Sequence, residues 1–506
     1  METESQLLGV TGQLQAPALV MMDALDLSRA IQSKRVSCRE VMAAYLDHIE
    51  RTNIRVNAII SLQDREALMW QAAARDEQLA RGEYLGWMHG FPHAVKDNAA
   101  TKGIRTTSGS PLLDTVPDVD AIFVERLKKN GAIIIGKTNT PEFCMGSQSY
   151  NPIFGTTLNA YDQSKTAGGS SGGAASALAL RMVPLADGSD IMGSLRNPAA
   201  FNNVFAFRPS YGRIPVGPSI EVFLQRLNAC GPIARTVADA AMLLSVMAGY
   251  DPSEPNTIQQ DPARFAAPLD RDFKGTRMGW LGNLGGYLAM EPGVMELCES
   301  SFQAFKAIGC SVEEARLAFP PEQMWEIWLT LRHWMGGANL LPLYTDPLKR
   351  KQMKPEAQWE VEGGLKLSAM DVYKASVGRT SYYQAMRKLF QSYDYLLLPS
   401  AQVFPFDAAT HWPREINGTI MDTYHRWMEV VVPASLSGSP AISVPAGFSE
   451  DGLAMGLQIS GPTHADFSVL QLAHAYEQAT NWVRKRLPPL LSGEKKPGGK
   501  LPGTRE

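Results

Sequence analysis

The sequence has few of the features that mark several classes of protein. Its 506 residues include only five cysteines, widely spaced and without a CxxC pair, so we expect neither a disulfide framework nor a zinc ribbon, and a reducing compartment is favoured. No apolar run approaches the roughly 18 residues of a membrane-spanning helix. The start, METESQLLGV, has no basic region leading into a long apolar run. We therefore expect no signal peptide and a cytoplasmic protein.

A strong charge of either sign is also absent. The chain carries 48 Lys and Arg against 51 Asp and Glu, a formal net charge of −3 at pH 7. This balance favours neither nucleic acid nor an anionic membrane as a partner, and we predict that it binds neither. The 45% apolar and 20% charged residues are typical of a globular protein.

Helical patterns dominate the first part of the chain. Residues 23–53 have the apolar spacing of two amphipathic helices, and Ser37 and Glu40 have capping-box spacing at the start of the second. Residues 63–82 predict a further helix that stops at Gly82.

The pattern then changes to alternating strands and helices. Short apolar runs at 90–97 and 131–138 predict buried strands, and the spacing between them, at 120–130, predicts a helix. This order predicts an α/β fold whose core contains a substantially parallel sheet. Further strands are expected at 394–400, 441–447 and 455–462, and the stretch 255–390 is richer in helix.

One motif matches a nucleotide-binding pattern, but its residues do not favour the loop that binds phosphate. Residues 131–138, GAIIIGKT, satisfy GxxxxGK[ST]. A phosphate-binding loop must curl so that successive backbone N–H groups face the phosphates. The β-branched Ile133–Ile135 run favours an extended strand instead, and Pro141 delays the following helix. A nucleotide-binding protein that uses residues 131–138 stays one alternative for the function of this chain.

The segment TAGGSSGGAASALALRM contains a more informative cluster. Ser170 and Ser171 lie among four glycines directly before a helix of small residues, and Ser194 ends a second Gly/Ser loop. A serine is a weak nucleophile unless a base takes its proton. Among the eight histidines none is an evident base, and Gly90 and Pro92 break the helix that a His89/His93 metal pair would need.

Lys96 is an alternative base. It follows the apolar strand in GFPHAVKDN, and side chains at strand ends often form the sites of α/β proteins. Burial there would favour the neutral amine, because desolvation disfavours an ammonium ion.

These motifs resemble those of the amidase signature family. The resemblance covers most of residues 23–485 and is carried by GFPHAVKDN, GKTNTPEF, TAGGSSGG, GSDIMGSLRNPAAFNNVFAFRPSYGRIP and, near the C-terminus, PASLSGSPAISVPAGFSEDGLAMGLQISGP. It implies a single large amidase-signature domain at 23–490, with a central mixed, largely parallel sheet covered by helices on both faces. Residues 1–22 are then expected to form an N-terminal arm, and residues 491–506 a disordered tail.

The resemblance also implies a Ser–cisSer–Lys triad. By position the base is Lys96, the middle serine with its cis peptide bond is Ser170, and the nucleophile is Ser194. Neutral Lys96 would accept a proton from Ser170, which accepts one from Ser194 as that serine attacks an amide carbonyl. Water then cleaves the acyl-enzyme by the same route. No metal or organic cofactor is implied.

Neighbouring residues receive supporting roles. The oxyanion would be held by backbone N–H groups of Ile191, Met192 and Gly193, with Ser194 a further candidate. Ser171 would orient the relay. Asp190 and Arg196 would brace the nucleophile loop by ion pairing or backbone hydrogen bonds. Met192 stands where the family usually has glycine. Its side chain either narrows the acyl site or packs away from it, and we expect packing.

The resemblance leaves the substrate open. It implies an amidase that acts on a small-molecule carboxamide, with an amidotransferase-type subunit or an esterase-leaning relative as alternatives. Trp325 and Trp328 in residues 324–334 have helical spacing, which is more often that of a core. Because this region of the family contributes to the substrate pocket, an aryl or apolar amide is the working hypothesis. The oligomeric state, a homodimer included, stays open.

Overall fold

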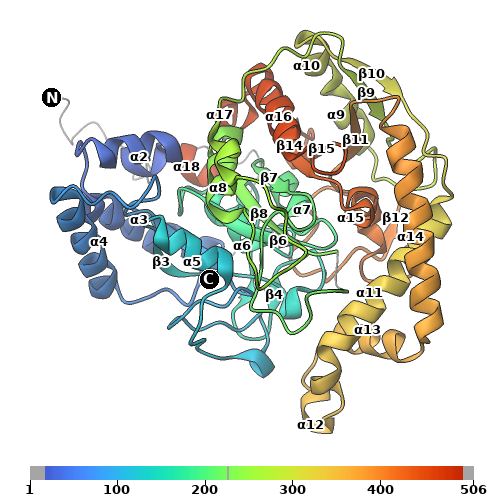
Figure 1. Ribbon diagram of the computed structural model, residues 1–506, viewed down its shortest axis with the longest axis horizontal. Helices are drawn as coiled ribbons and strands as arrows, with labels where there is room; N and C mark the ends of the chain where they lie inside the picture. The colour runs from blue at the N-terminus through green and yellow to red at the C-terminus, as the bar shows by residue number, and fades with distance from the viewer. Residues whose placement is uncertain (1–16, 225–226, 494–506) are drawn as a thin grey trace, which may run out of the picture.

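An 8-stranded mixed sheet runs through the computed structural model (Figure 1). The structure describes residues 17–224 and 227–493. In spatial order the strands are β10 (Ser311–Glu314), β9 (Arg277–Trp280), β11 (Tyr395–Pro399), β15 (Ala454–Ser460), β14 (Ala441–Phe448), β7 (Phe205–Arg208), β8 (Ala229–Ala234) and β6 (Ala186–Asp190). The predicted α/β class and the single large domain with a mixed central sheet are confirmed, and the strands expected at 394–400, 441–447 and 455–462 are β11, β14 and β15.

The direction of these strands corrects one part of the prediction. Only β9 pairs in parallel, with β10 and with β11. From β11 to β6 every neighbouring pair is antiparallel. The sheet is therefore mixed but not largely parallel. The strand–helix–strand pattern that suggested parallel pairing belongs to a different sheet.

That second sheet has three strands, in the order β1 (Ile59–Ile60), β3 (Ile133–Thr138) and β2 (Pro92–Lys96). β2 and β3 are parallel and are joined through α5 (Ile122–Lys129), as the sequence predicted. The GxxxxGK[ST] match lies in buried β3, where an extended backbone replaces the curl of a phosphate loop. Lys137 Nζ donates to Ala99 O at 2.6 Å and to Thr101 Oγ1 at 2.9 Å.

Helices cover both faces of the large sheet, as predicted. Gln458 on β15 hydrogen-bonds Arg196 on α7 (Arg196–Phe201). Gly461 lies one residue beyond the same strand, and by the alternation of a strand it points to the opposite face from Gln458. There it lies against Val469 on α16 (Asp466–Thr480). The other helices of this part are α6 (Gly172–Ala179), α8 (Val237–Met247), α9 (Val294–Ser300), α10 (Phe302–Ala307), α15 (Val432–Ser437), α17 (Trp482–Lys485) and α18 (Pro489–Ser492), with short 3₁₀ turns η5 (Pro262–Ala266) and η6 (Arg426–Val431).

The N-terminal helices follow the predicted caps. Ser37 Oγ accepts from Glu40 N and the Glu40 carboxylate accepts from Ser37 N, so the capping box is confirmed. The predicted third helix ends before Gly82, whose φ is 83°. The elements are α1 (Ala18–Met21), α2 (Ala24–Gln32), α3 (Cys38–Thr52), η2 (Asn53–Arg55) and α4 (Arg65–Ala80), followed by η3 (Pro111–Leu113), β4 (Tyr150–Asn151), β5 (Gly155–Thr156) and η4 (Glu142–Cys144).

A helical layer, drawn yellow to orange in Figure 1, lies along the opposite side of the molecule from α2–α4. It consists of α11 (Pro321–Tyr344), α12 (Pro347–Arg350), α13 (Pro355–Leu365) and α14 (Ala369–Leu389), and the small hairpin β12 (Glu415–Ile416) and β13 (Thr419–Ile420) follows in the chain. α11 packs against both α13 and α14. This layer matters because α11 also supplies part of the wall of the cavity described below.

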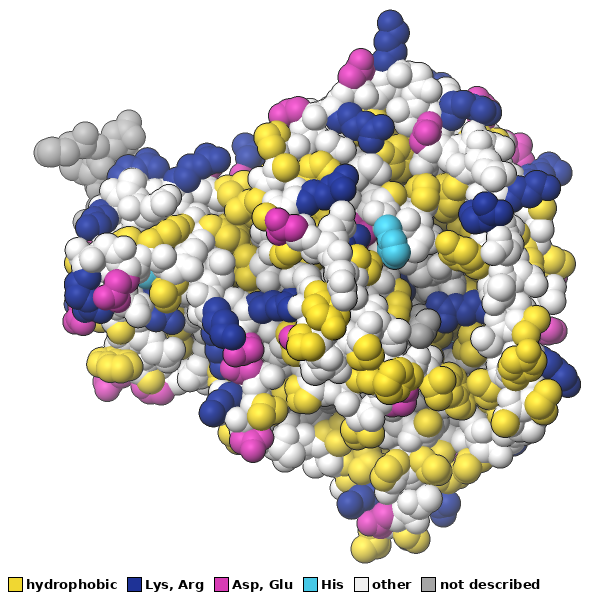
Figure 2. All heavy atoms as spheres, in the orientation of Figure 1, with side chains coloured by type: hydrophobic (Ala, Val, Ile, Leu, Met, Phe, Trp, Pro, Cys, Tyr) yellow, Lys and Arg dark blue, Asp and Glu magenta, His cyan; other side chains and the backbone are white. Residues whose placement is uncertain are grey.

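The surface matches the even charge balance. On the face drawn in Figure 2, basic and acidic side chains are interspersed rather than gathered by sign. None of the described helices is long and apolar enough to cross a membrane. All five cysteines are free. The predicted arm at 1–22 is described only from residue 17, where Val20 of α1 is buried, and most of the predicted tail lies outside the described residues.

Candidate active site

Lys96 ends strand β2 and is 1% exposed. Its ammonium or amine nitrogen Nζ donates to three hydroxyls: Ser170 Oγ at 2.7 Å, Ser171 Oγ at 2.9 Å and Ser189 Oγ at 2.9 Å. Burial lowers the pKa of Lys96 below its usual value, because an ammonium loses its hydration there. The residue thus has the two properties of a proton acceptor: contact with a hydroxyl, and a weakened hold on its own proton.

Ser170 and Ser171 occupy the turn before α6. The peptide bond between Gly169 and Ser170 is cis, which places the cis bond at the serine that the resemblance indicates. Glycine is needed here because a Cβ on Gly169 would lie 2.9 Å from the backbone of Gln148. Ser171 precedes the first residue of the helix, and its N–H donates to Ser194 O at 3.1 Å. The two Gly/Ser loops are therefore joined directly.

Ser194 lies in the loop that follows β6. It is partly exposed, and it lines the same cavity as Ser170. Within the described part of the chain its Oγ has no hydrogen-bond partner. The structure thus places Lys96 and Ser170 in direct contact and leaves the Ser194 hydroxyl open toward the cavity.

The same loop offers backbone donors. Gly193 N–H already donates to Asp190 Oδ1 at 2.8 Å. The N–H groups of Ile191, Met192 and Ser194 have no such partner among the described residues. An anion that forms beside Ser194 therefore has these three donors available, and Gly193 serves the loop instead.

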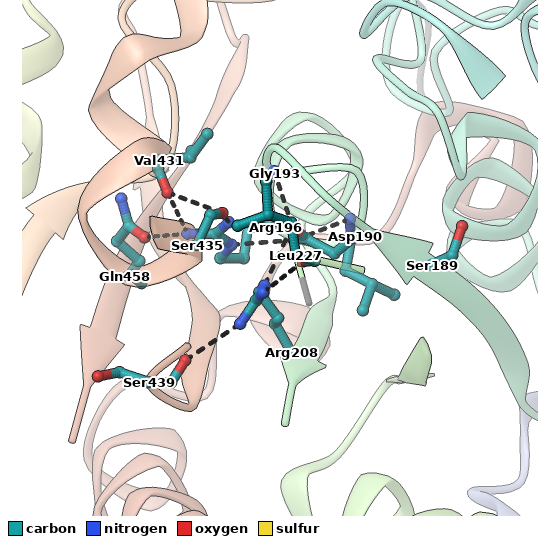
Figure 3. A network of polar contacts seen from close by, with 12 residues as sticks. Ser189, Asp190, Gly193, Arg196, Arg208, Leu227, Val431, Ser435, Ser439 and Gln458 are labelled. Atoms are coloured by element: carbon teal, nitrogen blue, oxygen red, sulfur yellow. Dashed lines mark hydrogen bonds and ion pairs between the residues drawn. The ribbon is translucent and has the colours of Figure 1, made fainter. Parts of the chain in front are cut away.

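A buried ion-pair network holds this loop (Figure 3). Arg196 binds both oxygens of Asp190 at 3.0 Å, and Asp190 also accepts from Leu195 N at 3.2 Å. Burial alone would raise the pKa of Asp190, but Arg196 and Arg208 outweigh it and bring the pKa to about 2. The carboxylate is therefore charged at neutral pH and fixes the loop through both an ion pair and backbone hydrogen bonds.

Arg196 and Arg208 extend this network to the C-terminal part of the chain. Arg196 donates to Val431 O at 2.9 Å, Gln458 Oε1 at 2.8 Å and Ser435 Oγ at 2.7 Å (Figure 3). Arg208 donates to Ser439 O at 3.3 Å. The nucleophile loop thus rests on β15 and α15, more than 200 residues further along the chain.

The cavity beside the serines has a volume of about 220 Å³. Both apolar and polar groups form its wall. The lining residues are Asn98, Ser108, Leu113, Phe143, Cys144, Gly146, Ser147, Ser170, Ser189, Ile191, Met192, Ser194, Asn228, Arg332, Leu340, Tyr424, His425 and Met428. Met192 is part of the hydrophobic core and also borders the cavity. The expectation that its side chain packs away from the site is therefore wrong, because Met192 is buried and still forms part of the cavity wall.

Sequence reasoning missed several residues here. Ser189 is one residue before Asp190 and contacts Lys96 as closely as Ser171 does. Asp187 accepts from Lys96 N at 3.2 Å and lies 3.0 Å from His93 Nε2. Ser189 and Asp187 are two residues apart on one face of β6, a strand that the sequence did not predict. His93 is a buried residue of edge strand β2, whereas His89 lies in a turn with Nε2 at 2.9 Å from Arg75 O.

The predicted aromatic helix is confirmed as α11, but its tryptophans belong to the core. Trp325 is 5% exposed and Trp328 0%. Neither is among the residues that line the cavity, to which α11 contributes Arg332 and Leu340. No group of three or more His, Cys, Asp or Glu side chains within residues 17–224 and 227–493 is placed to hold a metal ion.

Three comparisons with known proteins give results that agree with one another. The Amidase family model matches residues 40–470. The chain is 34% identical over 484 residues to the A subunit of the glutamyl-tRNA(Gln) amidotransferase of Alkaliphilus metalliredigens, covering 90% of this chain and 96% of that one. It is 33% identical over 474 residues to an acylamidase of Rhodococcus erythropolis, covering 92% and 97%. The crystal structure of a bacterial aryl acylamidase of the amidase signature enzymes superposes with a TM-score of 0.87 at 28% identity, covering 94% and 99%.

Proposed function

The chain belongs to the amidase signature family, and from this premise we propose that it hydrolyses the C–N bond of a small carboxamide through an acyl-enzyme on Ser194. The observation that carries the proposal is the contact of buried Lys96 Nζ with Ser170 Oγ at 2.7 Å, beside a cavity that Ser170 and Ser194 both line. A base, a relay hydroxyl and an open hydroxyl are the parts that serine nucleophilic catalysis needs.

The first half of the reaction forms the acyl-enzyme. Ser194 Oγ bonds to the amide carbon while its proton passes to Ser170, whose own proton passes to neutral Lys96. The carbonyl oxygen gains the negative charge, and the N–H groups of Ile191, Met192 and Ser194 stabilise it. Such a donor is commonly worth about 3 kcal/mol in the transition state. When the C–N bond breaks, the relay returns the proton to the departing amine or ammonia.

The second half consumes one water molecule. Water loses a proton to the same relay and attacks the acyl carbon, and Ser194 leaves with the returned proton. The products are a free carboxylic acid and an amine or ammonia. Ser171 and Ser189 keep Lys96 Nζ pointed at Ser170, since each accepts a hydrogen bond from it at 2.9 Å.

A fluorophosphonate probe tests the proposal without knowledge of the substrate. We expect one adduct, on Ser194, by intact mass and peptide mapping, and its loss in Ser194→Ala. Lys96→Met should slow labelling by about 10²–10⁴-fold, the usual contribution of a general base. Lys137→Met is the matched control, because Lys137 is a buried lysine on the adjacent strand whose Nζ donates to Ala99 O and Thr101 Oγ1 and, among the described residues, to no serine hydroxyl. Labelling that stays at the wild-type rate in Lys96→Met would contradict the relay.

The similarity to amidotransferase subunits favours a second candidate function. The relative at 34% identity is the A subunit of a glutamyl-tRNA(Gln) amidotransferase. As a subunit of this kind, the chain would deliver ammonia to a partner rather than release it. Rapid hydrolysis of simple amides by the purified chain alone would favour the hydrolase, and amide cleavage that appears only with a co-purifying partner would favour the amidotransferase. Rates on matched esters would identify an esterase-leaning relative.

A further inference from the structure

The cavity beside Ser194 has a single charged side chain on its wall. Among the described residues that line it, Arg332 of α11 is the only Lys, Arg, Asp or Glu. Its side chain is only 10% exposed, so the charge is presented to the cavity rather than to bulk solvent. A substrate in this cavity therefore meets a cation and no carboxylate.

Two hydrogen bonds fix the orientation of the Arg332 guanidinium. Its Nε donates to Glu360 Oε1 at 2.9 Å, and its Nη2 donates to Tyr424 Oη at 3.0 Å. Tyr424 in turn donates to Glu360 Oε1 at 2.6 Å. Nη1 has no partner among the described residues. The guanidinium is thus fixed by two of its nitrogens and keeps the third for a ligand, which reduces the entropy lost on binding.

Glu360 does not compete for the ligand. It is fully buried, is not part of the cavity wall, and its second oxygen lies 3.0 Å from His333 Nδ1. The other ionisable ring on the wall is His425, which stacks on Tyr424 with ring centroids 4.4 Å apart. Burial lowers the pKa of His425 to about 3, so the ring is neutral and adds no charge to the wall.

We propose that Arg332 binds a carboxylate that the substrate carries away from its scissile amide. The inference rests on the proposed amide hydrolysis and names its substrate class: small amides with one free carboxylate, such as the mono-amides of dicarboxylic acids. Guanidinium and carboxylate match in shape and charge, and charge-assisted hydrogen bonds are stronger than neutral ones. The apolar side chains of Leu113, Phe143 and Leu340 on the same wall suit the methylene chain between the two groups.

Three amides of matched length test this proposal on the wild-type enzyme. They are glutaramate, with a terminal carboxylate; 5-oxohexanamide, its neutral methyl ketone; and 5-aminopentanamide, with a terminal ammonium. We expect kcat/KM to fall in that order, with glutaramate at least about tenfold above the ketone, as a hydrogen bond to a charged group implies. Equal rates for the three, or a preference for the ammonium, would overturn the proposal.

Two variants place the preference on Arg332. Arg332→Gln alone leaves Glu360 charged and buried, so the double variant Arg332→Gln and Glu360→Gln removes both charges and keeps polar groups of similar size. We expect its glutaramate-to-ketone ratio of kcat/KM to fall by about tenfold or more, mainly through KM. Arg332→Lys, which keeps the charge, should recover part of the ratio. The matched control Arg316→Gln, at a side chain that is 85% exposed, should keep it at the wild-type value.

Fluorophosphonate labelling of Ser194 separates the possible failures. Labelling and amide hydrolysis with no carboxylate preference would overturn only the role of Arg332. Neither labelling nor hydrolysis of any amide by the wild type would overturn the proposed function itself. A double variant that labels normally but loses activity on the carboxylate and the ketone in equal proportion would show that Arg332 supports the cavity without recognising the carboxylate.

Discussion

At the scale of single residues, the site depends on one buried lysine surrounded by hydroxyls. The three serines around Lys96 Nζ accept three hydrogen bonds, as many as an ammonium can donate. A neutral amine donates two and keeps a lone pair for a proton. The surroundings therefore solvate both forms, while burial favours the neutral one. The relative stability of the charged and neutral forms sets the pKa of Lys96, and with it the pH above which the relay works.

Removing one hydroxyl should shift that pH. Only the neutral lysine accepts a proton, so kcat/KM should rise as pH increases through the lowered pKa of Lys96. Ser189→Ala removes an acceptor that favours the ammonium, and the rising limb should move to lower pH. About 1.5 kcal/mol for one charged hydrogen bond corresponds to about one pH unit. The measurement is the pH profile of kcat/KM.

Ser176→Ala is the control for this shift. Ser176 is also a buried serine, but its Oγ donates to Leu158 O and has no contact with Lys96. Its pH profile should coincide with that of the wild type. A rising limb that stays in place in Ser189→Ala, or that moves to higher pH, would show that Ser189 does not favour the charged lysine.

At the scale of elements, the close crossing of α11 and α13 positions Arg332 and its Glu360 partner. Glycines make the crossing possible: a Cβ on Gly364 would lie 2.7 Å from His333 O, closer than real contacts allow. Gly336, on the same interface, has only ordinary neighbours, the nearest at 3.6 Å. A Cβ therefore has room at Gly336 but not at Gly364, although both glycines lie in helices.

Alanine at these two glycines should have opposite effects. Gly364→Ala should force the helices apart and lower the free energy of unfolding by about 1–3 kcal/mol, as overpacking usually does. Gly336→Ala should leave it unchanged or raise it by up to about 1 kcal/mol, since alanine favours a helix. Urea unfolding measures both. Equal stability of the two variants would mean that the helices are free to separate, and would contradict the close crossing.

Many of these elements could be predicted from sequence, and the reason others could not is physical. The capping box at Ser37 and strands β2, β3, β11, β14 and β15 have strong local signals. Strand β6, with the sequence ADGSD, has none, because it is buried through small and polar residues. Strand direction depends on distant pairing, so local patterns predicted parallel strands where β14 and its neighbours are antiparallel.

The residues of the site also divide into those that the sequence predicts and those that it does not. Lys96, Ser170 and Ser194 lie in distinctive motifs and were predicted together, whereas Arg332 and Tyr424 are 92 residues apart and have no motif. Their meeting depends on how α11 and the chain near η6 pack. A specificity residue of this kind becomes visible only in three dimensions.

At the scale of the whole molecule, long-range buried contacts join residues 190–213 to the C-terminal part of the chain. Asp466, at the start of α16, is fully buried and accepts from Ser210 N at 2.7 Å and from Arg213 Nη2 at 2.8 Å. These partners are more than 250 residues earlier in the chain. Together with the contacts of Arg196 to β15 and α15, they predict that residues 23–490 unfold as one unit.

The variant Asp466→Asn tests whether residues 23–490 unfold as one unit. Breaking a buried pair from one side leaves Arg213 without its carboxylate, and the free energy of unfolding should fall by about 3–5 kcal/mol. If residues 23–490 are one domain, tryptophan fluorescence and fluorophosphonate labelling of Ser194 should lose their native signals at the same, lower urea concentration. Asp451→Asn, at an exposed turn between β14 and β15, should leave both midpoints where the wild type has them. Loss of fluorescence at a urea concentration where Ser194 still labels would instead mean that the C-terminal part unfolds separately, and that the nucleophile loop does not need it.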